Sequence, residues 1–284
     1  MIPYPSMRSL IEGQNIKFSN QLIIQDLDIT NKSFYTLVQQ TAHWLEQLGF
    51  KPREKIIIPE LKYPQSEILL YGVWHLGSIA VIPSDKDISD IKKVIRINTI
   101  IDKDIDLFKE VKDFPIQFEP KYKPLLDDEA IVTFEKDIGI RLSHYNLLVN
   151  VNSLQKSLGL KSRTRFSCDL KPRSSSWAVL KAILPVYCGF IIDNVDPEIT
   201  IGESKKDYNI RYDIHNLSEF SNTDIAICPE NSAVLSIGTS PMHLTNFSFE
   251  KKTLMIQGHS VMMGYTDDST NESCFKDQAL FLNI

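Results

Sequence analysis

Cysteine and histidine, the residues that most often carry metal or nucleophilic chemistry, are scattered through this sequence of 284 residues. The six histidines do not cluster, and the cysteines stand far apart with no Cys-x-x-Cys pair. Zinc sites and disulfide frameworks need ligands or partners at short, recurrent spacings. We therefore predict no metal site and no disulfide framework. The four cysteines are Cys168, Cys188, Cys228 and Cys274.

Two places could supply a nucleophile, and neither has the neighbours that it would need. The nucleophilic serine of many hydrolases lies in a Gly-x-Ser-x-Gly turn with a paired histidine, whereas Ser174 to Ser176 follow Pro172 and Arg173. We interpret these serines as helix-capping or loop residues. Cys168 has no adjacent basic residue that would lower the pKa of its thiol, so we predict that it is inert. We predict no catalytic residue.

The bulk composition is that of an ordinary globular protein, with 43% hydrophobic and 24% charged residues. A formal net charge of -5 gives no electrostatic reason to expect nucleic acid or an anionic membrane as a partner. No stretch reaches the roughly 20 apolar residues that cross a bilayer, and the first residues lack the basic and apolar regions of a signal peptide. We predict a cytoplasmic protein without a membrane span.

Hydrophobic periodicity predicts helices that alternate with short apolar strands. Four helices recur with apolar residues at three- and four-residue steps, and each is followed by a glycine at the position of a C-cap. Tight helix–strand alternation is typical of a parallel α/β sheet flanked by helices. The predicted helices span 33–48, 65–76, 143–158 and 177–187, and the strands span 20–30, 55–58, 78–83, 94–97, 100–101, 129–134 and 190–192.

The rest of the chain divides by composition. Residues 193–232 are polar and irregular, and we interpret them as a connection or peripheral strands. Residues 233–237 and 253–256 are predicted to be strands of an antiparallel, β-rich portion that spans 233–284. Residues 1–192 would form the α/β core, as two related subdomains of 1–125 and 126–192.

Three segments, in this order, resemble the N-terminal domain of AMP-forming acyl-CoA synthetases and related adenylate-forming ligases. Residues 33–83 are similar to the family's opening helix, strand, helix and strand. Residues 127–189 resemble its phosphate-loop region, including a His-x-Asn-Leu run that begins at His144. Residues 255–265, with the sequence Gly-His-Ser-Val-Met-Met-Gly-Tyr at 258–265, resemble a later motif of the family. The resemblance implies the fold of a shortened ligase N-terminal domain.

The resemblance also implies a phosphate loop, which here looks degraded. The family's loop is rich in Ser, Thr and Gly, whose N–H groups and hydroxyls hold the phosphates of ATP. Thr133, Lys136 and Gly139 are the remnants in this chain, and the loop has gained Glu135 and Asp137. Carboxylates would repel a polyphosphate. We therefore expect no cofactor, with ATP and Mg²⁺ required only if the chain is an active ligase.

Other family elements also look changed. Ser174 falls at the histidine of the acyl-pocket element, with Trp177 beside it, so these two residues and His144 are the candidate pocket residues. We find no counterpart of the magnesium-linked glutamate. The family's ribose-binding aspartate would align with Ile284, so we expect the mobile C-terminal domain to be absent. Residues 189–258 are too short for a whole family subdomain, and its deletion should bare an apolar part of the sheet.

Two functions follow from these observations. The first is a pseudoenzyme that has lost adenylation and binds an acyl or aryl molecule, a protein partner or a second copy of itself. The second is an active acyl- or aryl-CoA ligase, or an acyl-transfer enzyme, completed by a separate chain; the retained segment 258–265 favours it. An unrelated α/β protein that binds a sugar or nucleotide is a third hypothesis.

Overall fold

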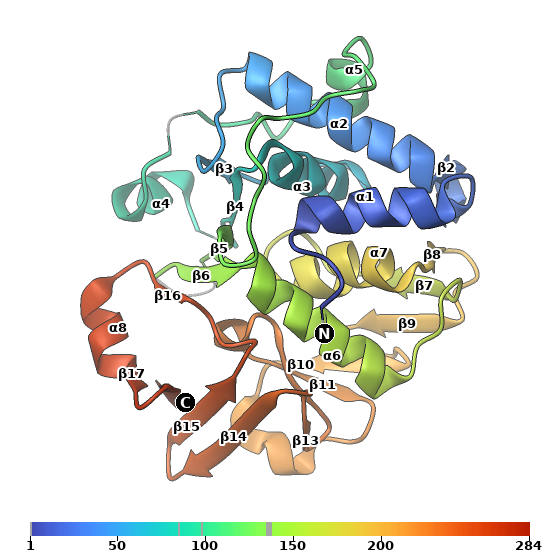
Figure 1. The fold of residues 1–284 in the computed structure, drawn as a ribbon. Coiled ribbons are helices and arrows are strands. Elements are labelled where there is room, and N and C mark those ends of the chain that lie inside the picture. The colour runs from blue at the N-terminus through green and yellow to red at the C-terminus, as the bar shows by residue number, and fades with distance from the viewer. Residues whose placement is uncertain (1, 85, 98, 135–137) are drawn as a thin grey trace.

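The computed structural model describes residues 2–84, 86–97, 99–134 and 138–284. Three sheets of nine, five and four strands form the framework, and helices pack on the two larger sheets (Figure 1). The two larger sheets contain parallel strands, whereas the four-stranded sheet at the end of the chain is antiparallel. The predicted fold class, a helix-flanked parallel α/β core with a C-terminal antiparallel portion, is confirmed.

The five-stranded sheet has the order β16-β6-β5-β4-β3. Its parallel strands are β3 (Lys55–Ile57), β4 (Ile79–Ile82) and β5 (Glu129–Thr133), and β6 (Ile140–Ser143) and β16 (Gly264–Tyr265) run antiparallel to their neighbours. All but β16 and β6 were predicted as strands. Its helices are α2 (Asn31–Gln47), α3 (Gln65–Leu76), α4 (Ile88–Val94) and α5 (Leu107–Val111).

The strands predicted at 94–97 and 100–101 are wrong. Helix α4 ends at Val94, and the described residues of 95–101 lie in no strand. Ile91, Ile95 and Ile97 are buried in a small cluster with apolar side chains of β3, β4 and β5. A short apolar run that covers a sheet has the same composition as a buried strand, which is why the pattern misled.

The nine-stranded sheet has the order β13-β12-β11-β10-β9-β7-β8-β1-β2. Six neighbouring strands, from β11 to β1, are parallel. Helix α1 (Met7–Phe18), helix α6 (His144–Leu158), the π-helix η2 (Trp177–Ile183) and α7 (Leu184–Cys188) pack against one another and on this sheet, with η2 contacting β7 and α6 contacting β12. Its strands are β1 (Leu22–Ile24), β2 (Ile29–Thr30), β7 (Arg165–Cys168), β8 (Ile191–Ile192), β9 (Ile199–Gly202), β10 (Tyr208–Arg211), β11 (Asp224–Ile227), β12 (Val234–Ile237) and β13 (Ser240–Pro241).

Residues 193–232 are therefore not an irregular connection, because they supply β9, β10 and β11 in the interior of the sheet. Parallel neighbours normally need a crossover of about a dozen residues, most often a helix. Here residues 203–207 join β9 to β10, and residues 212–223 with the short 3-10 helix η3 (Ile214–Glu219) join β10 to β11. The lack of crossover helices made the segment look irregular.

The sheet is not bared as an apolar surface, and this expectation is corrected. The register places Ser167 opposite Thr200 and Asn209 opposite Asp224 on one face, while Phe166, Ile201 and Ile225 point to the other. A parallel sheet normally has both faces covered by apolar packing. The second face also carries Ile191 and Ala226, but most of its residues on β7, β9, β10 and β11 are polar and partly paired with one another or with loop residues: Arg165, Ser167, Thr200, Asn209, Arg211 and Asp224.

The C-terminal sheet has the order β14-β15-β18-β17. Its strands are β14 (Thr245–Glu250), β15 (Thr253–Gly258), β17 (Phe275–Lys276) and β18 (Ala279–Asn283), and helix α8 (Asp268–Cys274) precedes β17. The strand predicted at 253–256 is confirmed as β15. The strand predicted at 233–237 also exists, but as β12 it joins the nine-stranded sheet. The predicted β-rich portion is thus shared between two sheets.

Helix α6 holds the three sheets together through a stripe of polar side chains. Ser143 caps the helix in a capping box with Asn146. The Asn146 amide also donates to the carbonyls of His259 and Val261, at 3.1 and 2.8 Å. One and two turns on, Asn150 binds the backbone of Asn231 and Val234, and Ser153 donates to His243 O at 2.8 Å. All three side chains are buried.

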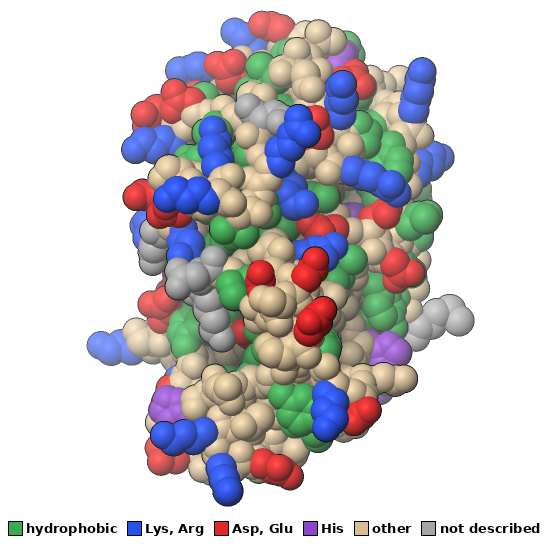
Figure 2. Space-filling model, turned by 90° about the vertical axis from the view of Figure 1, so that its left-hand side faces the viewer, with side chains coloured by type: hydrophobic (Ala, Val, Ile, Leu, Met, Phe, Trp, Pro, Cys, Tyr) green, Lys and Arg blue, Asp and Glu red, His purple; other side chains and the backbone are tan. Residues whose placement is uncertain are grey.

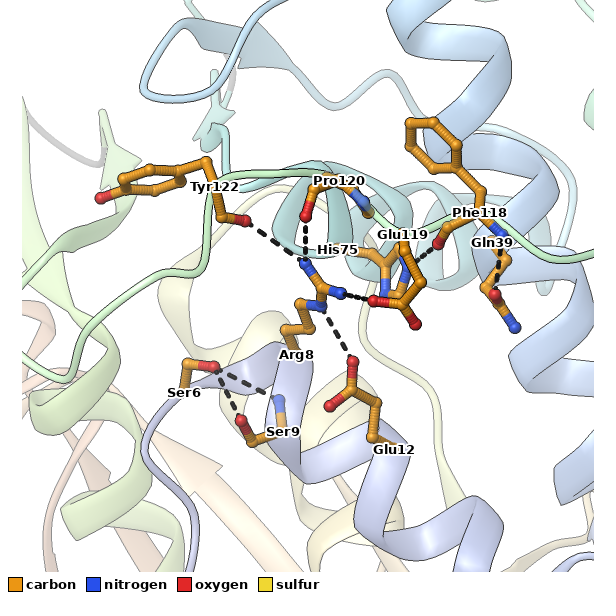
Figure 3. A network of polar contacts seen from close by, with 10 residues as sticks. All are labelled: Ser6, Arg8, Ser9, Glu12, Gln39, His75, Phe118, Glu119, Pro120 and Tyr122. Carbon is orange, nitrogen blue, oxygen red and sulfur yellow. Dashed lines mark hydrogen bonds and ion pairs between the residues drawn. The ribbon is translucent and has the colours of Figure 1, made fainter.

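The N-terminal helix α1, which periodicity did not predict, is fixed by a buried arginine (Figure 3). The Arg8 guanidinium donates to the carbonyls of Pro120 and Tyr122 and pairs with Glu12 and Glu119. Since a buried charge is tolerated only when its hydrogen bonds are satisfied, this network anchors α1 to the extended segment that leads into β5. The same segment is held from α2 and α3 by Gln39 and His75.

The surface carries both signs of charge over the face drawn in Figure 2, where hydrophobic side chains form only small separate areas. No helix among the described residues is both long and apolar enough to cross a bilayer.

Replacing Asn150 tests the role of the α6 stripe. The Asn150→Ala variant should lose about 1–3 kcal/mol of unfolding free energy, because it leaves the buried Val234 N–H without its acceptor. The carbonyls of Asn231 and Val234 lose one donor each but keep a second, from the Ala233 N–H and the Asn231 amide. Urea unfolding followed by circular dichroism measures this. Lys156→Ala, at an exposed position of the same helix, is the control and should change stability by less than about 0.5 kcal/mol. A similar small loss in both variants would contradict the assignment.

Candidate functional site

Parallel strands of both large sheets end at one groove, and open α/β sheets typically bind ligands outside the carboxyl ends of their strands. A cavity of about 670 Å³ lies beyond β7, β9 and β10 and includes Ser174 and Tyr212 in its lining. A second cavity of about 830 Å³ lies beyond β3 and β4 and is lined mainly by isoleucine, proline and charged residues. Ser84 and Arg173 line both cavities. We take this groove as the candidate site.

An ion-pair triad crosses the groove between the two sheets. The Glu60 carboxylate, after β3, pairs with Lys171 Nζ at 3.0 Å and with the Arg173 guanidinium at 3.0 Å, both from the loop after β7. Partial burial raises the pKa of Glu60, but the hydrogen bonds from Lys171 and Arg173 outweigh this effect and lower it. Lys171 and Arg173 are thus already paired with a protein carboxylate.

The remnants of the phosphate loop have structural partners. Thr133 ends β5 with a buried side chain and lies in register with Ile82 and Ile140. The Gly139 N–H donates to Thr266 Oγ1 at 3.0 Å, and its carbonyl accepts from the Thr266 N–H at 2.8 Å. A side chain at Gly139 would press on Thr266 and Val132, at 2.8 and 2.9 Å. The prediction for Lys136 lies outside the described residues.

The three predicted pocket residues are not brought together at one cavity. Ser174 lines the cavity beyond β7, β9 and β10. Its hydroxyl lies 2.6 Å from that of Ser176 and accepts from the Trp177 N–H at 3.2 Å. Trp177 is fully buried, and its indole donates to Glu67 Oε1 at 3.1 Å. Ser174 thus caps the start of this helical segment, one of the two roles predicted for the serines, whereas Ser176 makes no capping hydrogen bond. Trp177 fills the protein interior behind the groove.

Glu67 is a buried carboxyl group that the sequence analysis did not single out. It lies on α3, and burial raises its pKa, while Lys181 and the Trp177 indole act in the opposite direction. Cys168 lies nearby in the same interior, and burial raises the pKa of its thiol to about 12, which agrees with the prediction that it is inert. Glu67 lies within the predicted helix 65–76, and nothing in the sequence around it indicated that its carboxyl group would be buried.

His144 is a structural residue and lines none of the cavities described above. It begins α6, is buried, and its Nδ1 accepts from the Met7 N–H at 3.3 Å. Burial lowers its pKa to about 4, against a smaller opposite effect of Asp128. His144 therefore fixes the start of α6 against the N-terminal helix, in its neutral form.

Glu230 is a second carboxylate that the sequence analysis missed. It follows β11, one of the parallel strands, within the short helix η4 (Pro229–Asn231). Its side chain is 2% exposed and accepts from the Tyr265 hydroxyl at 3.2 Å and from the Cys228 thiol at 3.5 Å. The carboxylate therefore points into the protein. Among the described residues, no cluster of three or more histidine, cysteine, aspartate or glutamate side chains could hold a metal ion.

The retained segment 258–265 has a structural reason for its sequence. It crosses from β15 in the C-terminal sheet to β16 in the five-stranded sheet. Asn146 holds two of its carbonyls, Ser232 donates to Ser260 O at 2.7 Å, and Met262 N–H donates to Glu230 O at 2.8 Å. Its last residue, Tyr265, closes on Glu230. The segment ties the sheets together.

The sequence matches no protein-family model and no curated protein. The fold, however, is that of solved adenylate-forming ligases. It is similar to the N-terminal subdomain of NpsA from Klebsiella oxytoca (TM-score 0.77, 13% identity, 99% of this chain and 96% of that chain). It is also similar to O-succinylbenzoate coenzyme A synthetase from Bacillus subtilis (0.78, 13%, 98% and 75%) and to the anthranilate CoA ligase AuaEII in complex with anthranoyl-AMP (0.76, 13%, 99% and 74%).

The chain therefore has the fold of the N-terminal part of adenylation domains and acyl- or aryl-CoA synthetases. This confirms the fold that the resemblance implied. At 13% identity, the likeness establishes the fold alone, and what the chain does with it depends on its own residues.

The pKa of His144 predicts a pH-dependent stability. Its folded-state pKa of about 4 lies below the ordinary value of 6.5, so the unfolded chain binds the proton first as the pH falls. Stability should drop by roughly 3 kcal/mol between pH 6.5 and 4. In His144→Asn, a carbonyl oxygen replaces Nδ1 and this part of the pH dependence should vanish.

Urea unfolding at pH 7 and pH 4.5 checks this prediction. His215→Asn, at an exposed position, is the matched control and should keep the pH dependence of the unchanged protein. If His144→Asn kept it too, the assignment of a buried neutral imidazole would be wrong.

Proposed function

We propose that the chain is a non-catalytic relative of the adenylate-forming ligases that has kept the fold for binding. The observation that carries this proposal is a pair of hydrogen bonds between Gly139 and Thr266. The Gly139 N–H donates to Thr266 Oγ1, and the Gly139 carbonyl accepts from the Thr266 N–H. A phosphate loop acts through free N–H groups that converge on the anion. In this chain the N–H of Gly139, at the end of the loop, is instead committed to a hydrogen bond within the protein.

Two further observations support the proposal. The carboxylate of Glu230, at the end of a parallel strand, is buried against Tyr265 and Cys228, so it is not presented to a magnesium ion. The sequence also places Glu135 and Asp137 in the loop itself, where negative charge opposes a polyphosphate. Positioning of ATP by electrostatics is a large part of catalysis in such reactions, and these residues do not provide it.

The groove is the place for the bound molecule. An acyl or aryl group would lie against the apolar lining beyond β3 and β4, which includes Ile57, Ile58 and Ile88. Trp177 and Glu67 fill the interior behind it, so the molecule would stay in the groove. A protein partner or a second copy of the chain is the other occupant that this function allows.

The alternative function, an active ligase or acyl-transfer enzyme completed by a separate chain, was favoured by the retained segment 258–265. The contacts of this segment with Asn146, Ser232 and Glu230 account for it by packing. No other described feature favours that function, so we retain the non-catalytic proposal.

A calorimetric and thermal-shift titration with ATP and Mg²⁺, then with AMP and an acyl-CoA, tests the proposal. We expect ATP with Mg²⁺ to give no heat of binding and no change in melting temperature at millimolar concentration. Saturating ligand would otherwise stabilise the fold by a few kcal/mol, for example about 2.7 kcal/mol at 100 times its dissociation constant. Such a stabilisation by ATP would contradict the proposal and restore the enzyme hypothesis.

A further inference from the structure

A polar hollow in the C-terminal sheet lies apart from the groove and has no role in the function proposed above. It has a volume of about 580 Å³ and opens where β14 begins, β15 ends and β17 turns into β18. The backbone approaches itself closely beside it, since a side chain at Gly258 would come within 2.3 Å of Leu244 O. The residues that line it are Leu244, Asn246, Gln257, Gly258, His259, Asp277 and Gln278.

The side chains of this hollow have unused hydrogen-bonding capacity. Asn246 and Gln257 lie directly opposite each other on neighbouring strands, so their carboxamides project on the same face. With Asp277 and Gln278, they make no side-chain hydrogen bond or ion pair with any described residue. Each carboxamide offers both a donor and an acceptor. These side chains are exposed to solvent, so their donors and acceptors are available to a ligand with hydroxyl or amide functions.

His259 is held in place for such a ligand. Its Nδ1 lies 2.7 Å from the Tyr145 hydroxyl, and the two rings meet edge to face. Its carbonyl accepts from the Asn146 amide on α6 at 3.1 Å. The remaining ring nitrogen, Nε2, has no partner among the described residues. One polar group of the hollow is thus fixed by the rigid helix.

Turns fix the backbone around the hollow. Leu244, Asp277 and Gln278 have φ angles of 63°, 49° and 62°, in the left-handed region that non-glycine residues seldom adopt. Asp277 and Gln278 are the two central residues of the hairpin that joins β17 to β18, where a two-residue turn of type I′ requires a positive φ at both positions. Three such residues around one hollow, on two separate turns, fix the positions of the polar side chains.

The chemistry of the lining selects the class of ligand. No lysine or arginine lines the hollow, and Asp277 would repel an anion. Its one ring is the imidazole of His259, and no phenylalanine, tyrosine or tryptophan among the lining residues offers a larger stacking surface to a nucleobase. Leu244, 49% exposed, is the one apolar side chain of the lining. We propose that this hollow binds a neutral polyhydroxylated molecule of monosaccharide size, with hydroxyls on the carboxamides and a C–H face on Leu244.

Amide and histidine-ring NMR spectra test this proposal, with glucose, galactose, mannose, N-acetylglucosamine and inositol as separate titrants. We expect at least one to shift residues 244–246, 257–259 and 277–278 in a saturable manner. Asn246→Ala and Gln257→Ala should each weaken this binding about tenfold or more, the loss of one bidentate contact. Ser248→Ala is the matched control, because it is exposed on the same face of β14 but outside the hollow.

A second variant distinguishes binding at this hollow from non-specific binding elsewhere on the surface. Tyr145→Phe removes the hydroxyl that holds His259 and should weaken binding while leaving the amide spectrum of the fold unchanged. The proposal is overturned if none of the five titrants gives saturable shifts at these residues. It is also overturned if the shifts persist unchanged in Asn246→Ala and Gln257→Ala.

Discussion

The architecture depends on the buried polar stripe of helix α6. Asn146, Asn150 and Ser153 recur at steps of four and three residues, which places them on one face of the helix. Through backbone groups they fix the crossing segment 258–265, the turn after β11 and the start of the C-terminal sheet. A buried amide that lost its partners would cost the free energy of desolvation, so these contacts select one arrangement of the three sheets.

The same helix shows how residues that resemble ligase motifs serve the packing of this fold. His144 and Asn146, which match the family's motif, here contact the N-terminal helix and cap α6. The segment 258–265 connects two sheets and is bound by Asn146. Two groups of the candidate site have partners within the protein: the Gly139 N–H donates to Thr266, and the Glu230 carboxylate accepts from Tyr265. In the groove, Lys171 and Arg173 are likewise paired with Glu60.

Much of the fold followed from local patterns in the sequence. Helices closed by glycine, such as α3 at Gly77 and α6 at Gly159, and the apolar strands β3, β4 and β5 were predicted, because each signal is carried by neighbouring residues. Helix α1 was missed because its buried Arg8 looks like a surface residue until carbonyls far along the chain, at Pro120 and Tyr122, satisfy it.

The strands β9 to β11 and the site were harder to predict for a related reason. A strand such as β10 alternates polar and apolar residues because the second face of the sheet carries polar side chains, and its short connections lack the helices that mark a parallel sheet. At the site, the predicted pocket residue Ser174 lines the candidate groove, but Glu67 and Glu230 gave no signal in the sequence. Their significance depends on burial and on partners such as Trp177 and Tyr265, which only the folded chain brings near.

The exchange of the Gly139 amide proton, measured by NMR with and without ATP and Mg²⁺, tests the central claim most directly. The account predicts slow exchange, because the N–H donates to Thr266 Oγ1, and no change when ATP and Mg²⁺ are added. Thr266→Val, which removes the acceptor, should speed the exchange and serves as the control. Fast exchange in the unchanged protein that becomes slow with ATP would show a donor free for phosphate, and would contradict the account.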